Sequence, residues 1–172
     1  MMIIDNTEIV RIVTDIESEY NKSTTTTHYA ILYSKLAVIE FCGWIEQVFD
    51  SILDEYISSK LCLPANIVYI QNNIIKTNYG FHYDKNFRKM LISIIGINNL
   101  ENLEDYLENY SGFLLQFKSI LGSFTTTRNI AAHTYTPYAG TTVTYQSPSV
   151  VLSNIRLITP ILQKIENLIM RY

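Results

Sequence analysis

A run of apolar residues between His28 and Lys60 constrains the fold of this 172-residue chain more than any other feature. The apolar positions recur every three or four residues, which is the spacing of one face of an α-helix. They are Leu32, Leu36, Ile39, Cys42, Ile45, Phe49, Ile52 and Tyr56. Polar residues such as Gln47 and Asp54 lie mostly on the opposite face. The pattern therefore predicts one long central helix, against which shorter elements must pack.

Shorter stretches with the same periodicity flank the central helix. Five more helices are predicted, over Thr7–Tyr20, Asn66–Lys76, Asp84–Gly96, Phe113–His133 and Ser149–Met170. Asp84 is expected to cap the third of these and Gly96 to end it, and Pro160 is expected to kink the last. The acid-rich stretch Asn98–Tyr110 is expected to form a short solvated helix or a loop. The sequence thus predicts an all-α bundle with a long central helix, organised as a single domain over residues 1–172.

Thr134–Pro148 is the one stretch between predicted helices whose composition favours extended structure. Ala139-Gly140 separates two arms rich in threonine and tyrosine, which is typical of a short β-hairpin. The segment directly follows His133. Tyr135 and Tyr138 could there offer aromatic rings on which unpaired RNA bases stack, or they could simply anchor the loop to the fold.

The last six residues of the predicted Phe113–His133 helix, from Arg128 to His133, carry the chemistry of the chain. A neutral imidazole can accept the proton of a ribose 2′-hydroxyl, and a guanidinium, which keeps its charge, can stabilise the developing charge on the phosphate. Asn129 and His133 are four residues apart, so they share one face and the amide could orient the ring. Arg128, Asn129 and His133 are therefore candidate catalytic residues for RNA cleavage that needs no metal.

The angular positions of these residues indicate a dimer. Arg128 and His133 lie about 140° apart around a straight helix, so Arg128 must reach across the helix or serve the site of a neighbouring copy. The small Ala131 and Ala132 would let another backbone come close. We therefore expect a symmetric homodimer in which the helices of two copies face each other.

Two residues outside the six are further candidates. Glu40, the one charged residue between Leu36 and Ile45, could support His133, or it could belong to the polar stripe of the central helix. Lys118 could contribute to a local RNA-binding patch, or it could be an ordinary solvated cation. The net charge of −3 requires that any contact with RNA be local, because the chain cannot coat nucleic acid by bulk electrostatics.

The arginine, polar residue and histidine resemble the signature of the HEPN superfamily of helical ribonucleases and their relatives. The segment Phe81–Gly96 looks like the one that precedes the motif helix in the toxin-like and MAE-like branches, and Ile39–Glu46 is similar to the second helix of the family. The resemblance covers roughly residues 28 to 170. One position departs from the pattern, since Thr134 stands where these families often have glycine after the histidine.

The resemblance implies a HEPN-like helical bundle and a metal-independent endoribonuclease of a toxin or antiviral defence system. Such an enzyme would leave 2′,3′-cyclic phosphate and 5′-hydroxyl ends, would act on RNA as a homodimer and could be restrained by an antitoxin protein. The alternative is a HEPN-fold module that dimerises and binds RNA or protein without cutting.

The sequence offers no sign of a cofactor, a metal site or a membrane segment. The histidines lack partners at metal-ligand spacing, no glycine-rich phosphate loop is present, and no apolar run approaches about 20 residues. Cys42 and Cys62 are interpreted as two buried free thiols in a reducing compartment. We therefore expect a cytoplasmic protein without cofactor.

Overall fold

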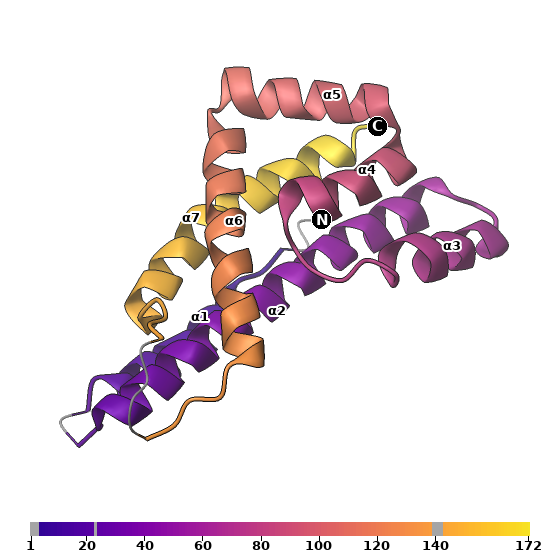
Figure 1. The fold of residues 1–172 in the computed structure, drawn as a ribbon. Coiled ribbons are helices and arrows are strands. Elements are labelled where there is room, and N and C mark those ends of the chain that lie inside the picture. Colours follow the sequence, from indigo (N-terminus) through magenta and orange to yellow (C-terminus); the bar gives the residue numbers. More distant parts are fainter. Residues whose placement is uncertain (1–3, 23, 139–142) are drawn as a thin grey trace.

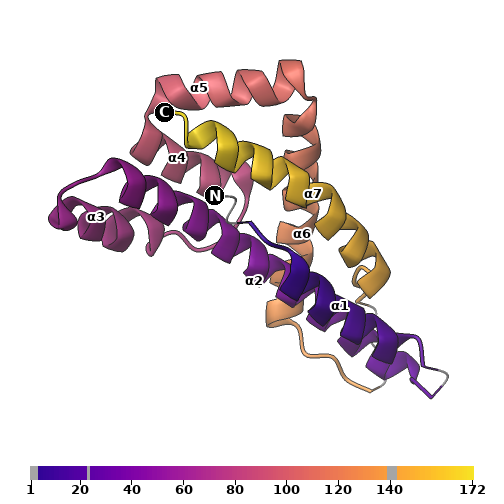
Figure 2. The same cartoon turned by 180° about the vertical axis from the view of Figure 1, so that it is seen from behind.

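The computed structural model describes residues 4–22, 24–138 and 143–172, and every regular element within these ranges is helical (Figures 1 and 2). The 34-residue helix α2 (Thr27–Lys60) forms the spine of the molecule. The hydroxyl of Thr26 caps its first turn by accepting a hydrogen bond from the backbone N–H of Tyr29. The predicted all-α fold and its long central helix are confirmed.

Two further helices pack along the spine. Helix α1 (Thr7–Tyr20) runs back along the N-terminal half of α2 and buries Ile9, Val13 and Ile16. Helix α7 (Pro148–Ile169) contacts both of them and contains Pro160, which faces solvent. Where a proline is exposed, its ring displaces no core residue, so α7 still contributes an almost continuous apolar face to the core.

Helix α6 (Phe113–His133) crosses α2 and has the bounds that the periodicity predicts. Aromatic rings form the crossing. The ring of Phe124 lies 4.3 Å from that of Phe41, and Phe117 meets Phe49 edge to face at 6.1 Å. These contacts join the middle of α6 to the middle of the spine, so the C-terminal end of α6 lies over the N-terminal half of α2.

The segment between α2 and α6 forms the other end of the molecule. It contains α3 (Pro64–Ile70), η1 (Gln71–Ile75), η2 (Tyr83–Phe87), α4 (Arg88–Ile95), α5 (Ile97–Asp105) and η3 (Tyr106–Tyr110), of which the three η elements are single π-helical turns. The predicted cap at Asp84 is wrong, because the helix starts earlier, at Tyr83. The ring of His82 accepts the capping hydrogen bond from the backbone of Lys85, while Asp84 pairs with Lys118.

The acid-rich stretch after Gly96 is helical rather than a loop, and it is packed against the core. Leu100, Leu103 and Leu107 are fully buried. Glu104 accepts two hydrogen bonds from Arg88, at 2.8 and 3.1 Å, and one from Tyr83, at 2.9 Å. Partial burial opposes ionisation of Glu104, but these hydrogen bonds outweigh it and hold the pKa of the carboxyl below its ordinary value.

The structure also bears on the expected β-hairpin, the two cysteines and the expected lack of a membrane segment. In the described residues of the hairpin arms, 134–138 and 143–147, the backbone forms no strand, and the expected turn at Ala139-Gly140 lies outside the described residues. Cys42 is buried as expected, but Cys62 is exposed because it lies in the connection after α2. Among the described helices, none is long and apolar enough to cross a membrane.

Candidate functional site

The six motif residues form the last turns of α6, where this helix leaves its crossing with α2. Ala131 faces α2 and is fully buried. Asn129 and His133 lie on the outer face of α6 and are exposed. Neither of these two side chains makes a hydrogen bond within the described part of the chain, so the Asn129 amide does not hold the His133 ring in this arrangement.

Arg128 points in a different direction, toward α2. Its Nη2 lies 3.8 Å from Oε1 of Glu46, which is too long for a hydrogen bond, and the side chains are 40% and 33% exposed. Oε1 of Glu46 is buried and has no hydrogen-bond partner within the described residues. The two charges therefore attract each other without saturating the donors of the guanidinium, which stay available for a ligand such as a phosphate.

An acidic stripe on α2 continues from this ion pair. Glu46, Asp50 and Asp54 follow one another at intervals of four residues, and Nε2 of Gln71 donates to Asp54 at 3.1 Å. Burial first, and then the charges of Asp54 and Glu46, raise the pKa of Asp50 to about 6. Arg128 thus lies at one end of a row of carboxylates that repel one another.

Cys42, one turn before Glu46 on the same face of α2, is not a usable nucleophile. Burial raises the pKa of its thiol far above the ordinary value, although the positive charge of Arg128 acts in the opposite direction. The thiol therefore stays protonated. Its position next to the guanidinium indicates that Arg128 packs over the Cys42–Glu46 turn of the spine.

The structure pairs the motif with Glu46 and leaves Glu40 elsewhere. Glu40 lies on the opposite side of α2, where it lines a groove with Trp44 and residues of α1. Glu40 and Glu46 are six residues apart, which places their side chains about 120° apart around the helix, so both cannot point at α6. Sequence reasoning missed Glu46, although its i, i+4 spacing from Cys42 and Asp50 was a signal that these residues share a face.

Lys35 is a second side chain that sequence reasoning missed. Its Nζ donates a hydrogen bond of 2.8 Å to the backbone carbonyl of Thr134, the residue that ends α6. A cation at this position compensates the partial negative charge at the C-terminus of the helix. It also brings positive charge within one residue of His133. No pattern in the sequence linked Lys35 to a carbonyl 99 residues later.

The other predicted RNA contacts divide into two groups. Tyr135 and Tyr138 follow the motif and are 81% and 79% exposed, and the ring of Tyr138 stacks on His28 at 4.0 Å. Lys118 lies ten residues before Arg128, or about 15 Å along α6, and is held by Asp84 at 3.3 Å and by the ring of Tyr83 at 4.9 Å. The structure therefore brings the two tyrosines, but not Lys118, to the motif end of α6.

The described residues offer no group of three or more histidine, cysteine, aspartate or glutamate side chains that could hold a metal ion. The acids of the Glu46 stripe are spaced one helical turn apart, and two of them are engaged by Arg128 and Gln71. What the site offers to a ligand is thus an imidazole, a guanidinium, an amide and a nearby ammonium group.

Comparison with known protein families gives a match over nearly the whole chain. The model of the protein family described as RiboL-PSP-HEPN matches residues 4–171, which includes α1 as well as the region that carries the motif. No curated protein and no solved structure matches the chain.

Proposed function

The chain belongs to the RiboL-PSP-HEPN family, and from this premise we propose that it is a metal-independent endoribonuclease of a toxin or antiviral defence system. The observation that carries the proposal is the arrangement of the motif at the end of α6. An exposed His133 and a half-exposed Arg128 with unsaturated donors lie within one and a half turns of helix, next to exposed aromatic rings. These groups match what cleavage through the ribose 2′-hydroxyl requires.

In the proposed reaction, His133 accepts the proton of the 2′-hydroxyl as its oxygen attacks the adjacent phosphorus. The bond between phosphorus and the 5′-oxygen breaks, and this oxygen leaves with a proton from a second imidazole or from water. Arg128 stabilises the negative charge on the phosphate oxygens in the transition state. Asn129 orients the phosphate or the ring. The products are a 2′,3′-cyclic phosphate and a 5′-hydroxyl.

A second copy of the chain would complete this site. Arg128 faces α2 while His133 faces outward, so one chain by itself turns its cation and its base in different directions. The outer face of α6 carries small side chains, including Ser119 and Thr126, and a β-carbon at Gly122 would meet nothing within 4 Å. We propose that two α6 helices pack at this face and that each active site takes His133 from one copy and Arg128 from the other.

The remaining residues would position the RNA. Lys35 lies at the end of α6 and could attract the backbone next to the scissile phosphate. Tyr135 and Tyr138 could stack on unpaired bases, which favours single-stranded RNA as the substrate class. Glu46 would act as a positioning residue, since its charge keeps the guanidinium of Arg128 over α2 until a phosphate competes for it.

Incubation of purified protein with single-stranded RNA in excess chelator tests the proposal. Cleavage that leaves 2′,3′-cyclic phosphate ends, and that stops when the scissile nucleotide is 2′-deoxy, is the expected result. Activity that requires added magnesium, or that persists on the 2′-deoxy substrate, would refute the mechanism.

A second candidate is a non-catalytic module that binds RNA or protein. It is favoured by one observation, namely that the ring of His133 makes no hydrogen bond within the described residues and so is not oriented by Asn129. Such a module would bind single-stranded RNA, or a protein, in the same experiment without shortening the RNA.

The cellular role rests on the family resemblance alone. A toxin should arrest growth when its expression is induced in bacterial cells, whereas His133→Ala should not, and co-expression of an antitoxin should relieve the arrest. Growth that is unaffected by the wild-type protein would argue against the toxin role while leaving the cleavage chemistry open to the test in vitro.

A further inference from the structure

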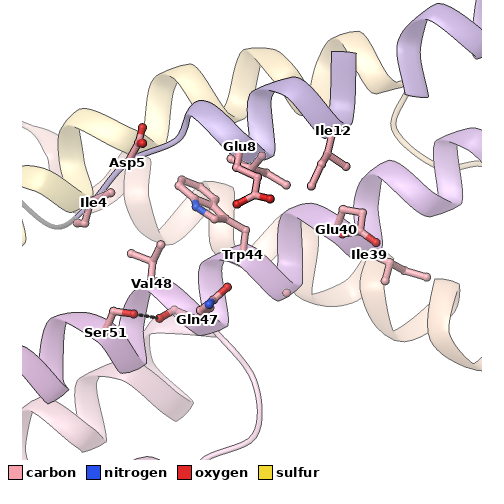
Figure 3. A pocket seen from close by; sticks show the side chains of 12 residues that line it. Ile4, Asp5, Glu8, Ile12, Ile39, Glu40, Trp44, Gln47, Val48 and Ser51 are labelled. Carbon is pink, nitrogen blue, oxygen red and sulfur yellow. Dashed lines mark hydrogen bonds between the residues drawn. The ribbon is translucent and has the colours of Figure 1, made fainter. Parts of the chain in front are cut away.

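A groove lies between α1 and α2, on the side of the spine opposite the Cys42–Glu46 turn that faces Arg128 (Figure 3). Its volume is about 690 Å³. On α2 the lining runs from Ile39 to Ser51, a length of about 18 Å or three helical turns. The groove is therefore long enough to hold one side of a short helix.

Apolar side chains form the floor of the groove. Figure 3 shows the ring of Trp44 reaching from α2 toward α1, with Val48 on one side of it and Ile12 opposite. Trp44 is only partly buried, and Ile39 at the far end is 38% exposed. A ligand that covers this floor would remove apolar surface from water.

Acidic side chains form both rims. Asp5 and Glu8 stand on the α1 side, and Glu40 stands on the α2 side. Asp5 accepts hydrogen bonds from the hydroxyl and the backbone of Thr7, which lower its pKa, so it is ionised at neutral pH. Residues 1–60, which include α1 and α2, contain ten of the 16 acidic residues but four of the 13 lysines and arginines, so these two helices together attract cations.

Gly43 also lines the groove, and no contact within the described residues accounts for a glycine at this position. It is exposed in the middle of the 34-residue helix α2, its φ is not positive, and a β-carbon there would meet no atom within 4 Å. Glycine at such a position destabilises a helix by about 1 kcal/mol relative to alanine. A neighbour that packs closely on the α2 backbone from outside the chain would explain why a side chain is absent.

We propose that the groove binds a basic amphipathic helix of a partner polypeptide. Its aliphatic side chains would cover Trp44 and the isoleucines, its lysines or arginines would meet the carboxylates on the two rims, and its backbone would approach α2 at Gly43. The length of the groove, its apolar floor and the placement of acids on both rims fit an amphipathic helix better than a small cation, which would leave the apolar floor uncovered. This surface is separate from the motif end of α6, so the inference does not depend on the proposed activity.

A displayed library of helical peptides tests the inference. Peptides of about 18 residues, or about 27 Å of helix, without tryptophan, would be selected against the full-length protein and sequenced. The expected binders carry net positive charge and aliphatic residues at i, i+3 or i+4, and i+7. Because Trp44 is the only tryptophan in the chain, its fluorescence should shift to the blue and saturate as a selected peptide fills the groove.

Matched variants locate the binding. Gly43→Leu adds a side chain in open space, so it should fold normally and weaken the selected peptide about tenfold or more, while Ser58→Leu, on an exposed turn of α2 outside the groove, should not. Glu8→Gln combined with Glu40→Gln should weaken binding and reduce its salt dependence. The double variant Glu101→Gln and Glu108→Gln makes the same change in charge elsewhere and should have no effect.

Three results would overturn the inference. One is that no peptide is enriched, or that the enriched peptides are neutral or acidic. Another is that they bind Gly43→Leu as tightly as the wild-type protein. The third is that spermidine alone shifts the fluorescence of Trp44 and competes fully with the peptide, which would identify the groove as a site for a small organic cation.

Discussion

Mixing two inactive variants should restore RNA cleavage if each active site takes its histidine and its arginine from different chains. Arg128 faces Glu46 on α2, whereas His133 lies about 140° away on the outer face of α6. Arg128→Ala and His133→Ala should each lower the rate by about 10²-fold or more, because each removes a whole electrostatic or acid–base contribution. Both residues are outside the core, so the variants should keep wild-type helicity.

The size of the recovery follows from the symmetry of the proposed dimer. A heterodimer of the two variants has one site with both residues intact and one site with neither. If subunits exchange at random, half of the dimers are heterodimers, so about a quarter of all sites are restored. The mixture should therefore reach about 25% of wild-type activity, which is about 25-fold above either variant alone.

The assay is a time course of cleavage of one labelled RNA by each variant and by an equimolar mixture, after partial denaturation and refolding to exchange subunits. Arg128→Lys in place of Arg128→Ala should also be poor alone, because an ammonium group cannot reproduce the planar fork of the guanidinium on a phosphate. A mixture no more active than the average of its components, in dimers shown to have exchanged, would mean that the site lies within one chain or that the motif does not cut RNA.

Three further predictions concern the scaffold around the site. Gly122→Leu should turn the proposed dimer into a monomer in light scattering and abolish cleavage while leaving the helical content intact, and a dimeric variant would exclude the outer face of α6 as the interface. Asp50 has a folded pKa of about 6, above its ordinary value of 3.8, so its contribution to stability falls as the pH rises between these values. Asp50→Asn should therefore stabilise the protein at pH 8 by about 1 kcal/mol, after allowance for a half-exposed group, and have little effect at pH 4 in urea denaturation. Glu104 is the opposite case. Its folded pKa is lowered, so its stabilising effect is lost as the pH falls from its ordinary 4.5 through the folded pKa. Glu104→Gln should therefore destabilise the protein by about 2 kcal/mol at pH 7 and by less at pH 3. Equal effects of either substitution at both pH values would contradict these linkages.

The sequence by itself determined the helices and the chemical groups of the candidate site. The bounds of α1 and α6 are those that the periodicity predicts, and α2 and α7 agree to within one residue at each end. Helical periodicity is a local property, because hydrogen bonds join residues four apart and an apolar face repeats every three or four residues. For the same reason, the sequence alone is enough to place Arg128, Asn129 and His133 on one helix.

The tertiary structure decided which side chains meet. The crossing of α6 over α2 directs Arg128 to Glu46 and leaves Glu40 on the far side of the spine, and it brings Lys35 to the end of α6. Packing also changed two local expectations, since the helix expected to be capped by Asp84 begins at the buried Tyr83, and the burial of three leucines packs the acid-rich stretch against the core rather than leaving it solvated. Contacts between residues far apart in the chain depend on crossing angles and on the fit of the core, and these are properties of the whole packed molecule rather than of any one segment.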